Sequence, residues 1–290
     1  MFMVSLVIPV YNESEAVGRV LDEVLAWAAT VPFPVEVVVV DDGSTDGTVE
    51  SAGRDGVRVV RHARNRGGGA ARSTGVRAAR HPVVCVMDGD ATYDPRDLTP
   101  LCRSLVEGKA RFAVGVRRGE SGTWPRLRSC VKAALRWGAS ALAGRPIPDL
   151  NSGMMCFRRR DALRMDPYLP RRHSWVTGFH LAAILLGWQV EYLPVSYRPR
   201  LGRSSFRPVA DTFFAFLQVL RTVTYFEPLR LYVPLFLASS AGAVGSALVH
   251  LGRKGTLEES DVILAAAAGM ALLTGTLADS MAARHRRGWG

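Results

Sequence analysis

Short apolar runs alternate with amphipathic stretches along the first 200 residues of the chain. Runs made almost entirely of β-branched residues, such as Val35–Val40, are typical of strands that are buried on both faces of a sheet. The predicted strands are Val4–Val10, Val35–Val40, Val57–Val60, Val83–Met87 and Phe112–Val116. Helices are predicted at about Ser14–Ala29, Gly68–Arg80 and Pro95–Glu107. Alternating strands and helices indicate an α/β fold with a mostly parallel sheet.

Apolar residues dominate the chain after about residue 200. Leu231–Leu251 and Val262–Ala278 contain no acidic residue, lysine or arginine. Each approaches the roughly 20 residues that a membrane-spanning helix needs. We therefore predict a transmembrane hairpin at 229–283, with helices at about 231–251 and 262–282. A buried helical pair in a soluble domain is the alternative, because glycine, alanine and serine lower the hydrophobicity of both segments.

Basic residues flank this hairpin on its outer sides. Arginines precede and follow it, at Arg221, Arg230, Arg284, Arg286 and Arg287. The positive-inside rule then predicts a multi-pass protein of the cell (inner) membrane whose N-terminal domain and basic tail, 284–290, are cytoplasmic. Arg253 and Lys254 in the linker weaken this inference.

Two further segments, 124–143 and 206–228, combine apolar and basic residues at helical spacing. Such helices lie in the headgroup region of a membrane. Helices that face the protein core are the alternative for both.

Composition narrows the class of partner. The 290 residues include 37 lysines and arginines against 26 acidic residues, and only three of the basic residues are lysines. This balance favours anionic partners: nucleic acid, an acidic membrane surface or a phosphorylated substrate. The basic cluster at 61–80 has no interleaved aromatic residue for base stacking, so we do not expect nucleic acid.

The cysteines and the N-terminus bear on the compartment. Cys85, Cys102, Cys130 and Cys156 form no C-x-x-C pair and have no histidine at metal-ligand spacing. We expect buried, reduced thiols. The first ten apolar residues lack a basic leader and predict a strand rather than a signal peptide.

Acidic turns follow two of the predicted buried strands. Asp41 and Asp42 come after the second strand, and Asp88 and Asp90 come after the fourth. Ligands of parallel sheets bind at the carboxyl ends of the strands. Paired carboxylates there suit Mg²⁺ or Mn²⁺ shared with a substrate diphosphate.

Four stretches match a known family in order and spacing: VSLVIPVYNE, VVVVDDGSTDGT, NRGGGAARSTGVRAA and VVCVMDGDATYDP. They resemble family 2 glycosyltransferases of the GT-A fold. DLNSGMMCFRR and GFHLAAILLGWQVEYLPVSYRPRLGRSSF resemble its dolichol-phosphate mannose synthase and polyprenyl-phosphate glycosyltransferase branch. The resemblance covers roughly residues 4 to 230. It implies a Rossmann-like GT-A domain at 1–205, followed by interfacial helices and the hairpin.

The resemblance also implies roles for the matching residues. Nucleotide-sugar contacts fall on Pro9, Tyr11, Glu13, Asp41, Asp42, Gly67, Asp88 and Asp90, of which Asp88 and Asp90 hold the metal. Acceptor phosphate contacts fall on Arg117, Arg203 and Ser204. The candidate catalytic residues are Asp90, Arg117, Asp149 and Arg203, with Asp149 as a base or an organiser. Turn or packing roles for Pro9 and Tyr11, and a solvated surface position for Arg117, are the alternatives.

Two features depart from familiar patterns. Ser204 and Ser205 stand where the branch commonly has serine and lysine, which leaves acceptor binding open, with Arg203 and Arg207 as replacements. The glycine run at 67–69 lacks the G-x-G-x-x-G spacing and does not follow the first strand, so no nicotinamide cofactor is expected.

The resemblance implies metal-dependent, inverting transfer of a hexose from a GDP- or UDP-sugar to a polyprenyl or dolichyl phosphate at the cytoplasmic membrane face. An ionised phosphate needs little help from a general base. The alternatives are transfer to another lipid or to a growing glycan, and a non-catalytic, membrane-tethered nucleotide-sugar binder. A homo-oligomer is possible, and the sequence identifies neither sugar nor nucleotide.

Overall fold

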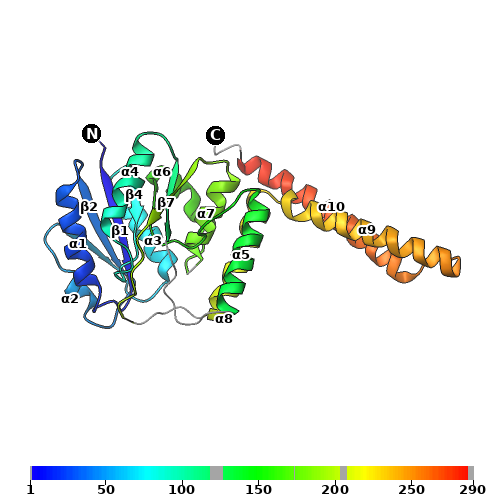
Figure 1. The fold of residues 1–290 in the computed structure, drawn as a ribbon, viewed down its shortest axis with the longest axis horizontal. Coiled ribbons are helices and arrows are strands. Elements are labelled where there is room, and N and C mark those ends of the chain that lie inside the picture. The colour runs from blue at the N-terminus through cyan, green and yellow to red at the C-terminus, as the bar shows by residue number, and fades with distance from the viewer. Residues whose placement is uncertain (1, 118–126, 173, 203–207, 287–290) are drawn as a thin grey trace.

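A seven-stranded sheet, in the order β3-β2-β1-β4-β6-β5-β7, forms the centre of the N-terminal domain (Figure 1). The computed structural model describes residues 2–117, 127–172, 174–202 and 208–286. The strands are β1 (Val4–Val10), β2 (Val35–Asp41), β3 (Val57–Arg61), β4 (Val83–Val86), β5 (Phe112–Arg117), β6 (Met155–Arg158) and β7 (Val190–Val195). Only β6 is antiparallel to its neighbours in this sheet. The predicted mostly parallel sheet is confirmed, and β6 and β7 are added to the strands that the apolar runs indicated.

Helices cover both faces of the sheet. One face carries α1 (Val17–Thr30) and α4 (Leu98–Val106), and the other carries α3 (Gly68–Ala78), α6 (Arg159–Met165) and α7 (Trp175–Leu185). The short elements are α2 (Thr48–Ala52), η1 (Pro95–Asp97) and η2 (Asp166–Tyr168). Successive side chains of a strand point to opposite faces. Val37 and Val39 therefore join the core under α1, while Val38 and Val40 join the core under α3, which explains the uninterrupted apolar run.

Two more helices, α5 (Leu127–Ala143) and α8 (Pro208–Phe226), form an outer layer beside α7. Val219 and Val223 of α8 are buried in the core that includes α7. Phe213 and Phe214 are 57% and 56% exposed on another side of the same helix. The two helices predicted at 124–143 and 206–228 are present, although residues 124–126 and 206–207 lie outside the described residues. Their place at a membrane surface stays a prediction.

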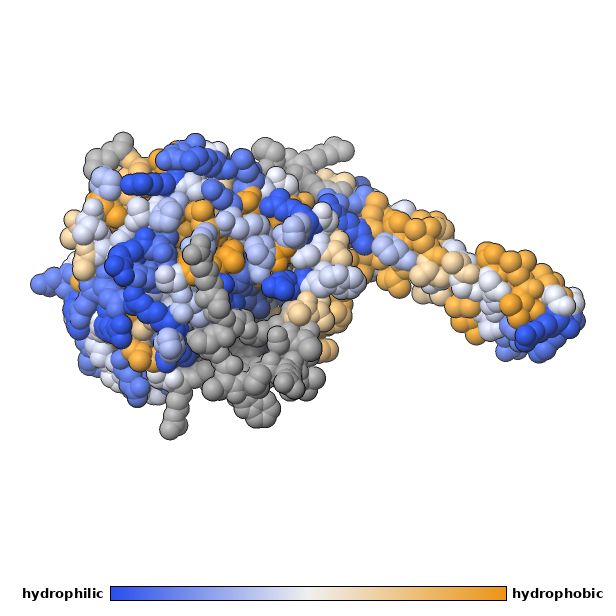
Figure 2. Space-filling model, in the orientation of Figure 1, coloured by the Kyte–Doolittle hydropathy of each residue, from blue (hydrophilic) through white to orange (hydrophobic). Residues whose placement is uncertain are grey.

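The helices α9 (Leu229–Lys254) and α10 (Glu259–Arg286) pack against each other as a hairpin that projects from the domain (Figure 1). Both are long and apolar enough to cross a membrane, by length and composition. Their most apolar windows are 0% and 17% buried, so they do not form the core of a soluble domain. Figure 2 shows apolar residues along the hairpin and hydrophilic ones at its far end.

Two cysteines depart from the expected free thiols. Cys85 of β4 and Cys156 of β6 are joined by a disulfide, with Cα atoms 4.1 Å apart. The register of the antiparallel pair places them opposite each other, although 71 residues separate them along the chain. The expectation of a free thiol is therefore wrong for these two residues. Cys102 is a buried free thiol.

Candidate active site

The acidic residues singled out in the sequence gather at one edge of the sheet. The central strand β1 pairs in parallel with β2 on one side and with β4 on the other. Asp41 ends β2, and Asp88 and Asp90 follow β4 by a few residues. Glu13 follows the end of β1 between them. Tyr11 comes directly after β1, and Pro9 lies within it.

Two arginines pair with the carboxylates of Asp88 and Asp90, which form the D-x-D turn. Arg72 of α3 donates from Nη2 to Asp88 Oδ1 at 2.5 Å. Arg200 places Nη1 3.2 Å from Asp90 Oδ2, and its Nη2 donates to Glu13 Oε1. Neither arginine was among the predicted site residues. Arg72 lies in the quoted stretch that follows β3, but its distance in sequence from Asp88 gave no signal of the contact.

The same cluster holds buried polar atoms that have no hydrogen-bond partner among the described residues. They are Glu13 Oε2, Arg72 Nε and Arg200 Nε. Buried polar atoms are normally satisfied, so an orphaned group requires an explanation. Three such atoms in one charged cluster fit a site that takes a charged ligand.

The electrostatics of the cluster favour a cation. The pKa of Glu13 is raised to about 7, mainly by burial, with the charges of Asp90 and Asp88 adding to the rise and that of Arg200 opposing it. Burial, followed by the charge of Asp88, also raises the pKa of Asp90. A nearby positive charge favours the ionised form of a carboxyl group. The donor set is oxygen throughout, which Mg²⁺ and Mn²⁺ prefer, so these residues fit the expected metal.

Gly153 brings the DLNSG stretch against this turn. A Cβ atom at Gly153 would lie 2.0 Å from Asp88 Oδ2. The Gly153 amide also donates to the hydroxyl of Tyr93 at 2.8 Å. Glycine is therefore required here because the carboxylate of Asp88 packs directly on the backbone.

Arg117 and Asp149 form a separate pair near the end of β5. Arg117 Nε and Nη2 donate to the two carboxylate oxygens of Asp149 at 2.7 and 2.9 Å. The Arg117 side chain is 18% exposed, so it is not a solvated surface arginine. Burial by itself would raise the pKa of Asp149, but the hydrogen bonds and charge of Arg117 outweigh it and lower that pKa. A carboxylate held in this way is a poor base and a good anchor for the guanidinium.

Asp41 and Asp42 are already engaged within the protein. Asp42 accepts from the backbone amides of Arg66 at 2.9 Å and Gly67 at 2.7 Å, and contacts His62 Nδ1 at 2.6 Å. Asp41 accepts from the Ser44 amide at 3.1 Å and lies 3.3 Å from Arg61 Nε. The bonds of Asp42 fix the loop between β3 and α3, and the Asp41–Ser44 bond fixes the turn after β2. A nucleotide contact by either carboxylate stays a prediction.

Gly67 has φ +100°, and a Cβ there would lie 2.6 Å from the carbonyl oxygen of Arg171. The loop therefore requires glycine at this position for packing, and its predicted substrate contact is untested. Arg203 and Ser204, predicted to bind the acceptor phosphate, lie outside the described residues.

A cavity of about 220 Å³ lies elsewhere, between α7 and α8. Tyr168, Gln218 and Arg221 are among the residues that line it, and none of the acidic residues above does. Charge and unsatisfied polar atoms, rather than cavity size, therefore locate the candidate chemistry.

Comparisons with known proteins bear on the family to which the chain belongs. An uncharacterized glycosyltransferase of Mycobacterium tuberculosis is 34% identical over 203 residues, which is 70% of this chain and 88% of the relative. A dolichyl-phosphate hexose transferase of Haloferax volcanii is 32% identical over 213 residues, covering 71% of this chain and 87% of the relative.

A solved structure shows the same fold. Glucosyl-3-phosphoglycerate synthase from Mycobacterium tuberculosis, in complex with Mn²⁺, UDP-glucose and phosphoglyceric acid, has a TM-score of 0.61 and 22% identity. The match covers 76% of this chain and 80% of that one. The model of the family described as "Glycosyl transferase family 2" matches residues 5–165, more than half of the chain. With the acidic cluster at the carboxyl ends of β1, β2 and β4, this match shows that the chain belongs to glycosyl transferase family 2 and is a glycosyltransferase.

Proposed function

We propose that the protein transfers a hexose from a nucleoside diphosphate sugar to a polyprenyl phosphate, with inversion at the anomeric carbon. The observation that carries the proposal is the cluster of Glu13, Asp88 and Asp90. In it the carboxyl pKa values of Glu13 and Asp90 are raised, and Glu13 and the two arginines paired with the cluster carry unsatisfied buried polar atoms. Similarity to a dolichyl-phosphate hexose transferase supports the acceptor class, and the Mn²⁺ and UDP-glucose in the structural neighbour support the donor class.

Asp88 and Asp90 would hold Mg²⁺ or Mn²⁺ together with the donor diphosphate. When bound, such an ion neutralises the charge that grows on the leaving diphosphate. Arg72 and Arg200 neutralise these carboxylates in the structure. If Asp88 and Asp90 bind the ion instead, both guanidinium groups would be available to donate to the phosphate oxygens of the donor. A guanidinium matches the geometry of a phosphate.

Arg117 would bind the acceptor phosphate, with Arg203 and Ser204, which follow β7 in the sequence. Asp149 orients Arg117 through two hydrogen bonds. An acceptor phosphate oxygen would attack the anomeric carbon, its C–O bond forming as the bond to the nucleoside diphosphate breaks. Because a phosphate monoester is already largely ionised near neutral pH, positioning contributes more than proton abstraction.

The hairpin would hold this site at the cytoplasmic membrane surface. The helices α9 and α10 expose their apolar side chains, as does α8 at Phe213 and Phe214. α5 runs across the direction of the hairpin beside its root, as a helix at the membrane surface would (Figure 1). An exposed apolar surface of this extent is typical of a membrane contact.

The test uses the purified full chain in detergent with polyprenyl phosphate, Mn²⁺ or Mg²⁺, and a panel of UDP- and GDP-sugars. We expect one glycosylated polyprenyl phosphate by mass spectrometry, and loss of at least about 100-fold in turnover for Asp88→Asn and Asp90→Asn. Asp22→Asn is the matched control, because Asp22 is a 67% exposed carboxylate on α1. Unchanged turnover in both Asp88→Asn and Asp90→Asn would rule out a metal-binding role for these residues. A glycosylated lipid that carries no phosphate would rule out polyprenyl phosphate as the acceptor.

A further inference from the structure

We infer that Arg198 is a positioning residue for the transfer reaction. It clamps the segment after β7, residues 196–201, against the D-x-D turn and α1, and thereby places Arg200 beside Glu13 and Asp90. The inference rests on the proposed function, since it assumes that this carboxylate cluster binds the donor.

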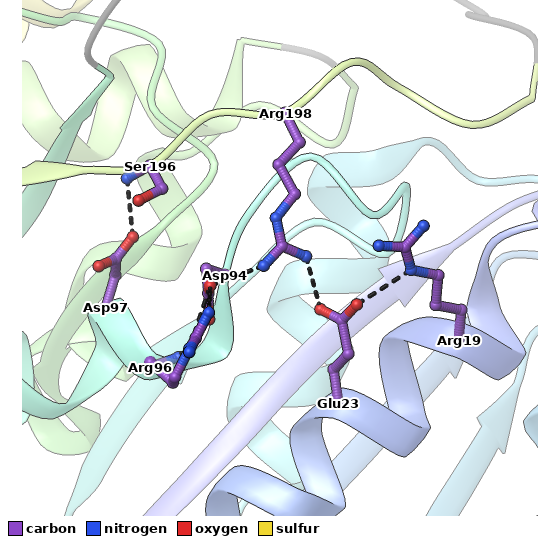
Figure 3. Close-up of polar contacts among 7 residues, drawn as sticks. All are labelled: Arg19, Glu23, Asp94, Arg96, Asp97, Ser196 and Arg198. Atoms are coloured by element: carbon purple, nitrogen blue, oxygen red, sulfur yellow. Dashed lines mark hydrogen bonds and ion pairs between the residues drawn. The ribbon is translucent and has the colours of Figure 1, made fainter.

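Arg198 joins two elements that are distant in sequence (Figure 3). Its Nη1 lies 2.8 Å from Glu23 Oε2 of α1, and its Nη2 lies 2.6 Å from Asp94 Oδ2. Asp94 lies four residues after Asp90 and caps η1, because its side chain accepts a hydrogen bond from the Arg96 amide. A planar guanidinium can satisfy two carboxylates at once, which the point charge of lysine does less well.

Backbone contacts run along the same segment. The Arg198 amide donates to the Thr92 carbonyl at 2.8 Å, and the Leu201 amide donates to the Asp90 carbonyl at 3.3 Å. The Ser196 amide donates to Asp97 Oδ2 at 2.7 Å (Figure 3). The segment therefore lies along residues 90–97, and Arg200 projects from its middle toward Glu13 and Asp90.

Two neighbouring arginines show what is specific to Arg198. Arg19 bonds to Glu23, and Arg96 bonds to Asp94, but neither is paired with both carboxylates among the described contacts. Their side chains are 55% and 79% exposed, against 30% for Arg198. Exposed ion pairs contribute little. Arg19 and Arg96 thus contact the same carboxylates as Arg198, but neither lies in the segment after β7. They serve as matched controls.

Without the Arg198 side chain, the segment loses its ion pairs with Glu23 and Asp94 and keeps its backbone bonds, so Arg200 is held less firmly at the site. The step that suffers is donor binding and activation, because Arg200 contacts the carboxylates predicted to bind metal and diphosphate. Small displacements of positioning groups lower rates by up to about 100-fold.

The experiment compares Arg198→Ala, Arg198→Lys, Arg19→Ala, Arg96→Ala, Arg200→Ala and the double variant of Arg198→Ala with Arg200→Ala. We expect Arg198→Ala to lower kcat/KM for the nucleotide-sugar by about 10- to 100-fold, with partial rescue by lysine. Arg19→Ala and Arg96→Ala should stay within about twofold of the unmodified protein. In the double variant, kcat/KM should be little lower than in Arg200→Ala alone, because the effects of two residues that act through one another are not additive.

A purely structural role makes a different prediction. If Arg198 only stabilised the fold, Arg198→Ala would lower Tm. The loss of kcat/KM in the double variant would then equal the product of the losses in Arg198→Ala and Arg200→Ala. That result, or a loss no greater than those of the two control variants, overturns the inference.

Binding of UDP and GDP with Mn²⁺ to the same variants gives a second readout that does not depend on the acceptor. Weakened nucleotide binding in Arg198→Ala, with intact binding in the controls, supports the inference even where polyprenyl phosphate is not the acceptor. Binding equal to that of the controls, in a protein that does transfer hexose, overturns the role of Arg198 and leaves the proposed function standing.

Discussion

Arg117 and Asp149 meet in a two-pronged ion pair, with both carboxylate oxygens of Asp149 within 2.9 Å of guanidinium nitrogens. We predict that Asp149→Asn raises KM for the acceptor by about 10-fold or more, because Arg117 loses its orientation. Arg117→Lys should act similarly, and the double variant should lose less than the product of the two effects. Initial rates against polyprenyl phosphate concentration measure this.

Arg111 and Asp161 provide the control pair. They have the same two-pronged geometry, at 2.9 Å for both contacts, near the opposite end of β5. Asp161→Asn should lower Tm and leave the acceptor KM unchanged. A general-base role for Asp149 would instead appear in kcat, with a displaced acidic limb of the pH–rate profile.

Gly153→Ala should disable the metal site without unfolding the domain. The added methyl group would lie 2.0 Å from Asp88 Oδ2, so the carboxylate must move. We expect turnover to fall by about 100-fold and the Mn²⁺ concentration for half-activation to rise. Gly138→Ala in α5 meets nothing within 4 Å and is the control. Activity near that of Gly138→Ala would contradict the packing argument.

Glu13 should make cation binding depend on pH. Its pKa is raised from 4.5 to about 7, so below pH 7 a cation at the cluster must displace a proton. Apparent Mn²⁺ affinity should therefore rise with pH, by at most about tenfold per unit, and level off above the pKa of Glu13. The same shift means that the metal-free fold loses stability as pH rises from 4.5 through 7, because ionised Glu13 is disfavoured in the folded state.

Glu13→Gln should flatten this pH dependence, measured as Mn²⁺ activation across the same range. Glu15→Gln is the control, because Glu15 is an exposed carboxylate two residues further along. An unchanged slope in Glu13→Gln would assign the pH dependence to another group.

The hairpin linker and the catalytic domain should lie on opposite sides of the membrane. Arginines on the outer flanks of the hairpin predict a cytoplasmic domain. Thr256→Cys in the linker should react with a membrane-impermeant maleimide in intact spheroplasts, and Asp55→Cys in the domain should react only after lysis. The unmodified protein gives the background from its native cysteines. Labelling in the reverse order would invert the proposed orientation.

Much of the fold could be predicted because the relevant signals are local. The run at residues 37–40 is apolar at every position, as a strand between two helical layers must be, and its neighbours in the core confirm both faces. The acidic turn at Asp88 begins two residues after the end of its strand. Parallel strands share a carboxyl edge, so Asp41 and Asp88 could be placed at the same edge of the sheet from the sequence.

The rest depended on contacts between segments that are far apart along the chain. Arg200 meets Glu13 across 187 residues, and Arg198 meets Glu23 across 175. Cys85 meets Cys156 through the register of an antiparallel pair that no periodic pattern reveals. Residue order sets helix, strand and turn through interactions with near neighbours. Which carboxylate each arginine reaches is set by strand register and helix packing, and these exist only once the chain has folded.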